Sequence, residues 1–125
     1  MTTWTTGELH KIEAAEELEL ASRRLDGTLR NPVTIWVVRV RDDAYVRSWK
    51  GHGAAWFRAT QLRHQGHIQA SGVDKDVTFV AETDDAVNDQ IDAVYRTKYR
   101  RHAARYVDPM VAAQARAATI KLVPR

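Results

Sequence analysis

The longest apolar stretch of the chain runs from Thr34 to Val40 and is β-branched or aromatic at all positions but one. This composition is typical of a strand packed on both faces, because an amphipathic helix would need a longer run with a period of 3.6 residues. Asp42 and Asp43 follow, and aspartate tolerates the backbone geometry of a tight turn. We therefore predict a β-hairpin whose loop consists of these two aspartates.

A two-residue loop fixes the register of this hairpin, because residues then pair outward from the loop. Trp36 and Trp49 come to lie opposite each other, and Arg47 projects from the same face between the two indoles. A shift of one residue would move Arg47 to the opposite face. The predicted pairs are Val40 with Tyr45, Val38 with Arg47, and Trp36 with Trp49.

Arg47 has two interpretations, and the sequence leaves both open. In the first, its guanidinium packs on an indole face at the rim of a barrel, a cation–π contact worth about 0.5–2 kcal/mol. In the second, it binds the phosphate or carboxylate of a ligand, because its planar fork can donate two parallel hydrogen bonds to an oxyanion. The indoles would then supply flat walls for a small anionic aromatic ligand.

Further strands are predicted where polar and apolar residues alternate over a few positions. Residues 17–22 show this alternation, but Leu18 also stands at helical spacing from Ala14 and Ala21, so strand and helix both remain open there. The other predicted strands are 45–49, 66–71, 77–81 and 118–123, with a turn at 74–76 between the second and third of them.

With 17–22 counted as a strand, the chain has six short strands, several of them joined by tight turns. Such strands form an antiparallel sheet, and in a small domain they close most economically into a barrel. The predicted fold is therefore of the α+β class, mainly β, with flanking helices.

Helices are predicted at both ends of this strand-rich region. Thr5 and Glu8 have the spacing of a capping box, so a helix should begin near Thr6. A short helix is expected over 54–62, where the chain leaves the first hairpin.

The longest predicted helix is capped by Thr83 and ends near His102, and a short helix with Pro109 at its first position follows through Ala115. Acidic residues begin the long helix and basic residues end it, an arrangement that the helix dipole favours. The dipole thus explains the basic residues late in the chain without a nucleic-acid partner. These residues are Arg96, Lys98, Arg100, Arg101 and Arg105.

Length and composition narrow the class of protein. A chain of 125 residues is expected to form a single domain spanning 1–125. It contains no cysteine, which excludes disulfides and thiolate metal sites. The first residues are acidic and amphipathic rather than basic and apolar, and no apolar run could span a bilayer. We expect a cytoplasmic protein that binds neither membrane nor nucleic acid.

Few motifs suggest chemistry. His64 and His67 have a spacing that could suit a metal, but they straddle a loop–strand junction without a nearby carboxylate, so no metal is expected. The sequence contains no glycine-rich phosphate loop and no Gly-x-Ser-x-Gly motif. It therefore lacks the usual sequence signatures of dinucleotide-binding proteins, NTPases and hydrolases. Four aspartates are interpreted as the solvated face of the long helix. They are Asp84, Asp85, Asp89 and Asp92.

Several segments together resemble a known family. The segments are TIWVVRV, AYVRSW, WFRA, GHIQASGV, DVTFV, DAVYRTKY and ATIKLVPR. They resemble a family of small bacterial proteins known only as a domain of unknown function, over nearly the whole chain. More distantly, the layout is similar to the flavin-binding split barrels, the superfamily of pyridoxamine-phosphate oxidases and deazaflavin-dependent reductases. The resemblance implies a six-stranded antiparallel split barrel and favours a strand at 17–22.

The resemblance also implies a site. In the superfamily, FMN or a deazaflavin lies at a homodimer interface, and basic and hydroxyl residues hold its phosphate. Carried onto this chain, the phosphate-binding positions correspond to Arg47, Ser48, Lys50 and Arg58. Three tryptophans would lie beside the cofactor, with Trp36 or Trp49 stacking near its ring. The cofactor-binding candidates are Trp36, Arg47, Ser48, Trp49, Lys50, Trp56 and Arg58.

Two functional classes follow. In the first, the protein is an oxidoreductase that binds and orients FMN or a deazaflavin, and the cofactor performs the hydride chemistry. In the second, it is a non-catalytic domain that uses Trp36, Arg47 and Trp49 to bind a small anionic aromatic molecule or a partner subunit.

Overall fold

The computed structural model describes residues 3–125. The helices are α1 (Thr6–Ala14), α2 (Ala55–Arg63), α3 (Asp85–Lys98), α4 (Ala104–Val111) and α5 (Ala113–Arg116), and a 3-10 turn, η1, spans Gly51–Gly53. The strands are β1 (Leu18–Ser22), β2 (Val33–Ile35), β3 (Val38–Val40), β4 (Asp43–Arg47), β5 (Gln65–Ala70), β6 (Val73–Ala81) and β7 (Thr119–Pro124). None of the helices in this range has the length and apolar character that crossing a membrane requires.

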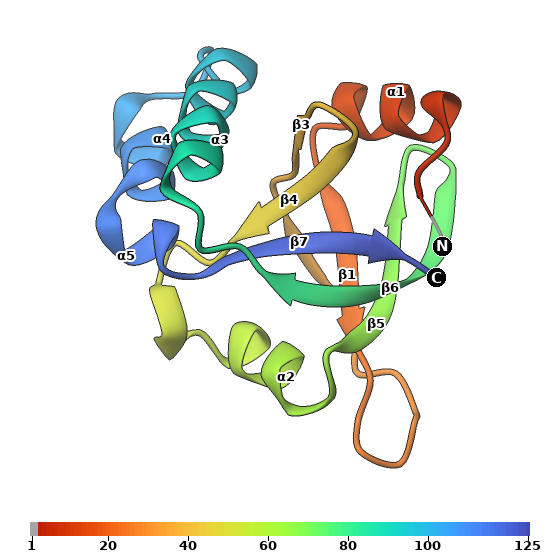
Figure 1. The fold of residues 1–125 in the computed structure, drawn as a ribbon. Coiled ribbons are helices and arrows are strands. Elements are labelled where there is room, and N and C mark those ends of the chain that lie inside the picture. Colours follow the sequence, from red (N-terminus) through yellow and green to blue (C-terminus); the bar gives the residue numbers. More distant parts are fainter. Residues whose placement is uncertain (1–2) are drawn as a thin grey trace.

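All seven strands belong to one antiparallel sheet in the order β2-β1-β5-β6-β7-β4-β3. Its two outermost strands, β2 and β3, are separated in the chain only by Trp36 and Val37. Two residues can join opposite ends of a sheet only if the sheet curls until its edges approach. The result is the curled half-barrel seen in Figure 1, which confirms an α+β fold of the split-barrel type.

The seventh strand arises where the sequence predicts one continuous strand. The run from Thr34 to Val40 bends at Trp36 and Val37, so that its first half pairs with β1 and its second half with β4. The composition of the run is correct for a strand, but it does not reveal that the two halves have different partners. The prediction of six strands was therefore one too few.

The predicted register of the first hairpin was wrong by two positions. Val38 pairs with Tyr45 and Val40 with Asp43, which leaves Arg41 and Asp42 as the loop. Arg41 has a φ of 56°, the left-handed conformation that a two-residue hairpin loop needs. An even shift keeps every side chain on its predicted face. The direct pairing of Trp36 with Trp49 is lost, because both lie outside the strands.

The turn between β5 and β6 also lies earlier than predicted. Ala70 pairs with Val73, so Ser71 and Gly72 form the loop, with φ values of 46° and 90°. Glycine adopts this backbone without strain, and its presence selects the turn. The charged segment 74–76, predicted as the turn, continues as part of β6.

Helices form in each region where the sequence predicts one, but their lengths and ends differ from the prediction. The capping box of α1 forms as predicted between Thr5 and Glu8. The N-cap of α3 is Asp84 rather than the predicted Thr83, because the Asp84 carboxylate accepts a hydrogen bond from the backbone amide of Val87. Pro109, predicted at the first position of a helix, lies in the second half of α4.

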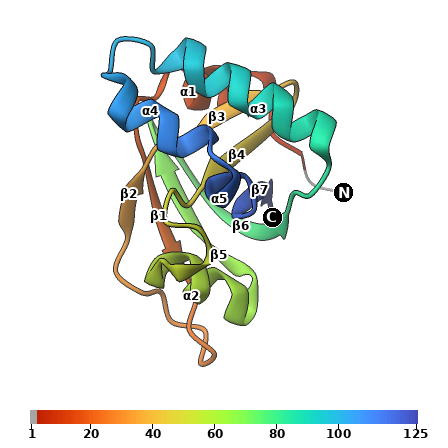
Figure 2. The ribbon, with the colours of Figure 1, turned by 90° about the vertical axis from the view of Figure 1, so that its left-hand side faces the viewer.

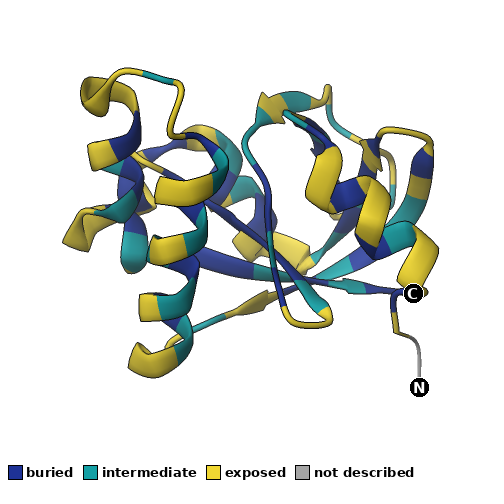
Figure 3. Ribbon diagram, turned by 90° about the horizontal axis from the view of Figure 1, so that it is seen from above, coloured by how far each residue is buried: buried dark blue, intermediate teal, exposed yellow. Residues whose placement is uncertain are grey.

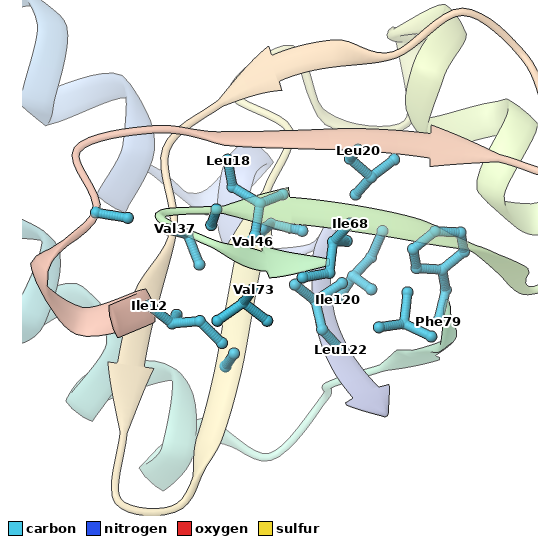
Figure 4. Close-up of a cluster of buried hydrophobic side chains, with 14 of the residues drawn as sticks. Ile12, Leu18, Leu20, Val37, Val46, Ile68, Val73, Phe79, Ile120 and Leu122 are labelled. Carbon is cyan, nitrogen blue, oxygen red and sulfur yellow. The ribbon is translucent and has the colours of Figure 1, made fainter. Parts of the chain in front are cut away.

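Two buried clusters hold the fold together. The larger one fills the interior of the half-barrel with side chains from α1 and most of the strands (Figure 4). The smaller one lies between the outer face of β3 and β4 and the helices α3 and α4, which stand together at one end of the molecule (Figure 2). Its members are Val38, Val40, Tyr45, Ile91, Tyr95, Tyr99, Val107 and Met110. Seen from above, the helices bury one side and expose the other (Figure 3).

Candidate functional site

Three of the four tryptophans line one groove of about 620 Å³, which we call the tryptophan groove. It lies between β2 and the bend that follows it, the end of β4, α2 and α4. Its lining residues are Val33, Thr34, Ile35, Trp36, Arg47, Trp49, Trp56, Arg105, Tyr106, Pro109 and Met110. Four of the seven predicted site residues therefore converge here, although they come from three separate segments.

Trp36 is held in place by α3. Its indole stacks on the ring of Tyr99, with centroids 3.9 Å apart and planes within 3° of parallel. The Tyr99 hydroxyl in turn accepts a hydrogen bond from the backbone amide of Val37, at 3.1 Å, and lies 2.8 Å from the carbonyl oxygen of Glu16. Burial raises the pKa of Tyr99, so its phenol stays protonated. The bend that splits the predicted strand thus fixes one aromatic wall of the groove.

Trp49 and Trp56 supply further aromatic surface with different exposure. Trp49 follows β4 and is 55% exposed, with the Lys50 ammonium 5.3 Å from its ring centroid. Trp56 stands in the first turn of α2, half-buried against the core, with its ring edge-on to Phe57 at 6.2 Å. In this groove, the indoles of Trp36 and Trp56 are packed against other side chains, whereas the indole of Trp49 lies exposed at the edge.

Arg47 lies at the bottom of the groove and is 1% exposed. All five of its N–H donors have protein acceptors. Nε donates to the Thr119 hydroxyl at 2.9 Å, and one terminal nitrogen donates to Asp92 at 2.5 Å and to the Met110 carbonyl at 2.9 Å. The other donates to the side chain of Asn88 at 2.7 Å and to its carbonyl at 3.2 Å.

This network joins β4 and β7 to α3 and α4, and it leaves the guanidinium no donor for a ligand oxyanion. Of the two interpretations of Arg47, internal packing is the one that the geometry supports. The aromatic partner is Tyr95, whose ring centroid lies 5.5 Å from the guanidinium carbon, rather than a tryptophan.

Asp92 corrects the prediction that four aspartates form a solvated face of α3. Its two carboxylate oxygens bind Arg47 at 2.5 Å and Arg116 at 2.6 Å, and its side chain is only 23% exposed. Asp89, one turn away, is 74% exposed and contacts Arg116 alone. Asp92 is therefore the counter-charge of a buried arginine, and Asp89 is a surface carboxylate.

The other predicted phosphate-binding residues lie around the groove without lining it. The Ser48 hydroxyl is buried and donates to the Gly51 carbonyl at 2.8 Å, where it shapes the loop after β4. Lys50 is exposed beside Trp49, and Arg58 is exposed on α2. Within the described residues, the Arg58 side chain makes no hydrogen bond or ion pair.

Arg105 and Tyr106 are groove residues that the sequence analysis missed. Both belong to the first turn of α4, and the Arg105 guanidinium lies 4.9 Å from the Tyr106 ring centroid and donates to its hydroxyl at 3.2 Å. Within residues 3–125, Arg105 forms no ion pair. Our dipole explanation does not apply to it, because the dipole disfavours a cation at a helix N-terminus. The sequence offered no signal for this position, because the predicted helix began at Pro109 rather than at Ala104.

His67 lies away from the groove, on the β5–β6 hairpin. Its two ring nitrogens contact the carboxylates of Asp74 and Asp76 across the strands, and Asp76 also pairs with Arg23 at 3.1 Å. In the part of the chain that the structure describes, no three histidine, aspartate or glutamate side chains are arranged to hold a metal ion.

Solved structures share this fold at low sequence identity. HutZ, the heme storage protein from Vibrio cholerae, aligns over 96% of this chain and 89% of its own length, with 16% identity and a TM-score of 0.64. A FAD-binding protein from Mesorhizobium loti aligns over 98% and 91%, with 17% identity and a TM-score of 0.61. An F420 reductase aligns over 98% and 94%, with 14% identity and a TM-score of 0.59. Identities this low establish the fold and leave function open.

A family model matches most of the chain by sequence. No curated protein matches the chain. Residues 8–122 match the model of a family described as uncharacterized proteins conserved in bacteria, DUF2255. The match covers α1 through most of β7 and so includes every element of the tryptophan groove. The chain belongs to the DUF2255 family.

Proposed function

We propose that the tryptophan groove binds a flavin-type cofactor, FMN or a deazaflavin, and that the protein is an oxidoreductase of the split-barrel type. The observation that carries this proposal is the convergence of Trp36, Trp49 and Trp56 on one groove of about 620 Å³. Flat aromatic walls suit a fused-ring ligand, and the volume is within the range of small-molecule sites. Proteins of the same fold whose names specify FAD or F420 lend further support.

The residues present fit the ring of such a cofactor better than the phosphate site that the resemblance implies. Arg47 and Ser48 have their hydrogen-bond donors engaged inside the protein. The cations that remain for a phosphate are Arg105 in the groove and Lys50 and Arg58 nearby. We propose these three, with Arg105 first, as the residues that meet the negative group.

A flavin or deazaflavin supplies hydride transfer when bound. The chain's own side chains would bind and orient it, with Trp36, stacked on Tyr99, as a fixed wall and the exposed Trp49 at the edge of the groove. No proton transfer from a side chain is part of this proposal.

The homodimer that the resemblance implies belongs to the same proposal. Trp49 and Tyr106 are 55% and 54% exposed at the edge of the groove, which gives a second subunit apolar surface to cover. Sedimentation equilibrium tests this part separately: we expect a dimer, and a monomer at high micromolar concentration would contradict it.

The engaged donors of Arg47 and Ser48 favour a second candidate, a non-catalytic site for small anionic aromatic molecules. Such a site needs flat walls and one accessible cation but no dedicated phosphate cradle. Comparison of FMN with naphthalenesulfonate distinguishes the two candidates. A cofactor site should bind FMN at least about 10-fold more tightly, a difference of about 1.4 kcal/mol.

The direct test is a titration of FMN into the full chain, followed by quenching of flavin fluorescence. We expect saturable binding that weakens about 10-fold in Trp49→Ala, because loss of one stacking ring removes about 1–3 kcal/mol. Leu62→Ala is the matched control, since Leu62 is 59% exposed on α2 and lies outside the groove. Equal binding by both variants, or none by the wild type, would overturn the proposal.

A further inference from the structure

A second cleft, of about 580 Å³, lies between α1, β3 and α3 and shares no lining residue with the tryptophan groove. The three elements meet at the same end of the molecule (Figure 2). Its lining residues are Glu13, Arg39, Ala93, Val94, Thr97, Lys98, Arg100 and Arg101. We call it the basic cleft, because four of these side chains are cationic and one is a carboxylate.

Lys98 is the cation at the inner side of the basic cleft. Its ammonium donates to the Val37 carbonyl at 2.6 Å and lies 3.4 Å from the carbonyl of Ile12. Within the described residues it has no carboxylate partner, and the Tyr99 ring lies 5.3 Å away. Burial lowers the pKa of Lys98 to about 8, although the charges of Glu16 and Glu13 oppose this shift. A half-buried ammonium held only by carbonyl dipoles gains stability from an anion beside it.

The three arginines of the basic cleft differ in how far carboxylates neutralise them, and Arg100 is the one without an ion pair among the described residues. Arg100 is exposed, and its only side-chain bond among the described residues is to the Thr97 carbonyl at 3.4 Å. Arg39 lies 3.5 Å from Glu13 and 3.9 Å from Asp42, which is 91% exposed. Arg101 alone has a short ion pair, at 2.5 Å to Glu16. Several guanidinium groups around one hollow suit a ligand with more than one negative oxygen.

We propose that the basic cleft binds a small phosphate-bearing molecule, at a site independent of the tryptophan groove. No described carboxylate forms an ion pair with Lys98 or Arg100, although the charges of Glu13 and Glu16 act on Lys98. Arg39 lies on the β3 side, where Glu13 and Asp42 are its partners. Phosphate is favoured over a monocarboxylate because it places two charges and three acceptor oxygens among these donors. The cleft is several times larger than one phosphate group, so the phosphate is expected to be an ester on a small organic body.

Calorimetry on the full chain at low ionic strength, with inorganic pyrophosphate as the probe, tests this proposal. We expect binding with a Kd below about 1 mM. Arg100→Gln and Lys98→Gln should each weaken it about 5-fold or more, since each removes a charge-assisted contact. Arg100 is exposed, so its variant remains informative even if Lys98→Gln fails to fold.

Arg96→Gln is the matched control. Arg96 is on α3 one half-turn before Lys98, is 58% exposed, and does not line the cleft. It removes the same charge from a position close in the chain but outside the cleft, so it should change the affinity by less than about 2-fold. Equal losses in Arg96→Gln and Arg100→Gln would mean that diffuse charge binds the probe, and would overturn the proposal.

Two further results would also overturn it. One is the absence of binding at millimolar pyrophosphate in folded wild-type protein. The other is tighter binding of a single-stranded oligonucleotide that depends on the same two residues, because the cleft would then belong to a nucleic-acid surface. None of these outcomes depends on whether FMN binds in the tryptophan groove.

Discussion

Arg47 and Arg105 line the same groove, yet their surroundings are opposite. Arg47 is 1% exposed, and its five donors meet acceptors on α3, α4 and β7. Arg105 is exposed, and among the described residues its guanidinium contacts the ring and hydroxyl of Tyr106 but no carboxylate. One arginine is part of the structure that builds the groove, and the other is available to what enters it.

The difference shows that a guanidinium in a groove is not in itself a ligand-binding group. What matters is how many of its donors remain free after the protein's own acceptors are counted. By this criterion, we propose that Arg105 at the start of α4, rather than Arg47 at the end of β4, meets an anion in the groove. The following predictions test this division, from the largest effect to the smallest.

Asp92→Ala should destabilise the protein strongly, because it leaves the charge of Arg47 buried without its partner. We expect the free energy of unfolding in urea to fall by about 3–5 kcal/mol. Asp89→Ala is the matched control: it also removes an Arg116 partner from α3, but at a surface position, and should lower this free energy by only about 0–1 kcal/mol. If both variants lost a similar free energy of unfolding, Asp92 would be no more important than a surface carboxylate, which would contradict its assignment to the interior network.

Replacement of arginine by lysine compares the two arginines directly. Arg47→Lys keeps the charge but removes the planar fork, so several acceptors lose their donor, and we expect a loss of about 1–3 kcal/mol in unfolding free energy. Arg105→Lys should change it by less than about 0.5 kcal/mol. If Arg105→Lys were as destabilising as Arg47→Lys, Arg105 would have to be a structural residue too.

Arg105→Gln should weaken FMN binding without affecting stability. An exposed charge contact contributes about 0.2–1 kcal/mol, so we expect an affinity about 1.4- to 5-fold lower and a weaker dependence on salt. The flavin-fluorescence titration measures both. Arg96→Gln, an exposed arginine outside the groove, is the control and should bind FMN like the wild type.

The smallest effect is expected at His67, where charges are paired but exposed. Burial opposes its protonation, but the hydrogen bonds that its ring donates to the carboxylates of Asp76 and Asp74 outweigh burial and raise the pKa of His67. A raised pKa in the folded state stabilises the protein at pH values below about 6.5, and this contribution disappears as the pH rises through the folded-state pKa.

Urea unfolding of the wild type and His67→Gln at pH 6 and pH 9 measures this contribution. The wild type should exceed the variant by about 0.2–1 kcal/mol more at pH 6 than at pH 9. A His67 contribution larger than the loss caused by Asp92→Ala would contradict this account. It would mean that an exposed charge pair stabilises the protein as much as the buried network of Arg47.

The sequence predicted what local patterns determine. The capping box at Thr5 and Glu8, the strand character of Thr34 to Val40 and the faces of the first hairpin all follow from residues close in the chain. The break at Trp36 could not be predicted in this way, because it depends on β1 and β4 competing for the two halves of one run.

The candidate site was predicted in part for the same reason. Trp36, Trp49 and Trp56 line one groove, and their role as cofactor-binding residues stays a prediction. The partners of Arg47 are Asn88, Asp92 and Thr119, which are 41, 45 and 72 residues away in the chain. No local pattern indicates such contacts, so the sequence placed Asp92 on the surface and left Arg47 open between packing and ligand binding.

The indole N–H signals of the four tryptophans offer the most direct test of ligand binding in the tryptophan groove. Trp4 is an internal control, because it is buried and its indole N–H donates to the Leu122 carbonyl at 3.0 Å, outside the groove. In nitrogen–proton correlation spectra of the protein titrated with FMN, we predict shifts for Trp36, Trp49 and Trp56 and none for Trp4. Unchanged signals at saturating FMN, or equal shifts of all four, would contradict the account.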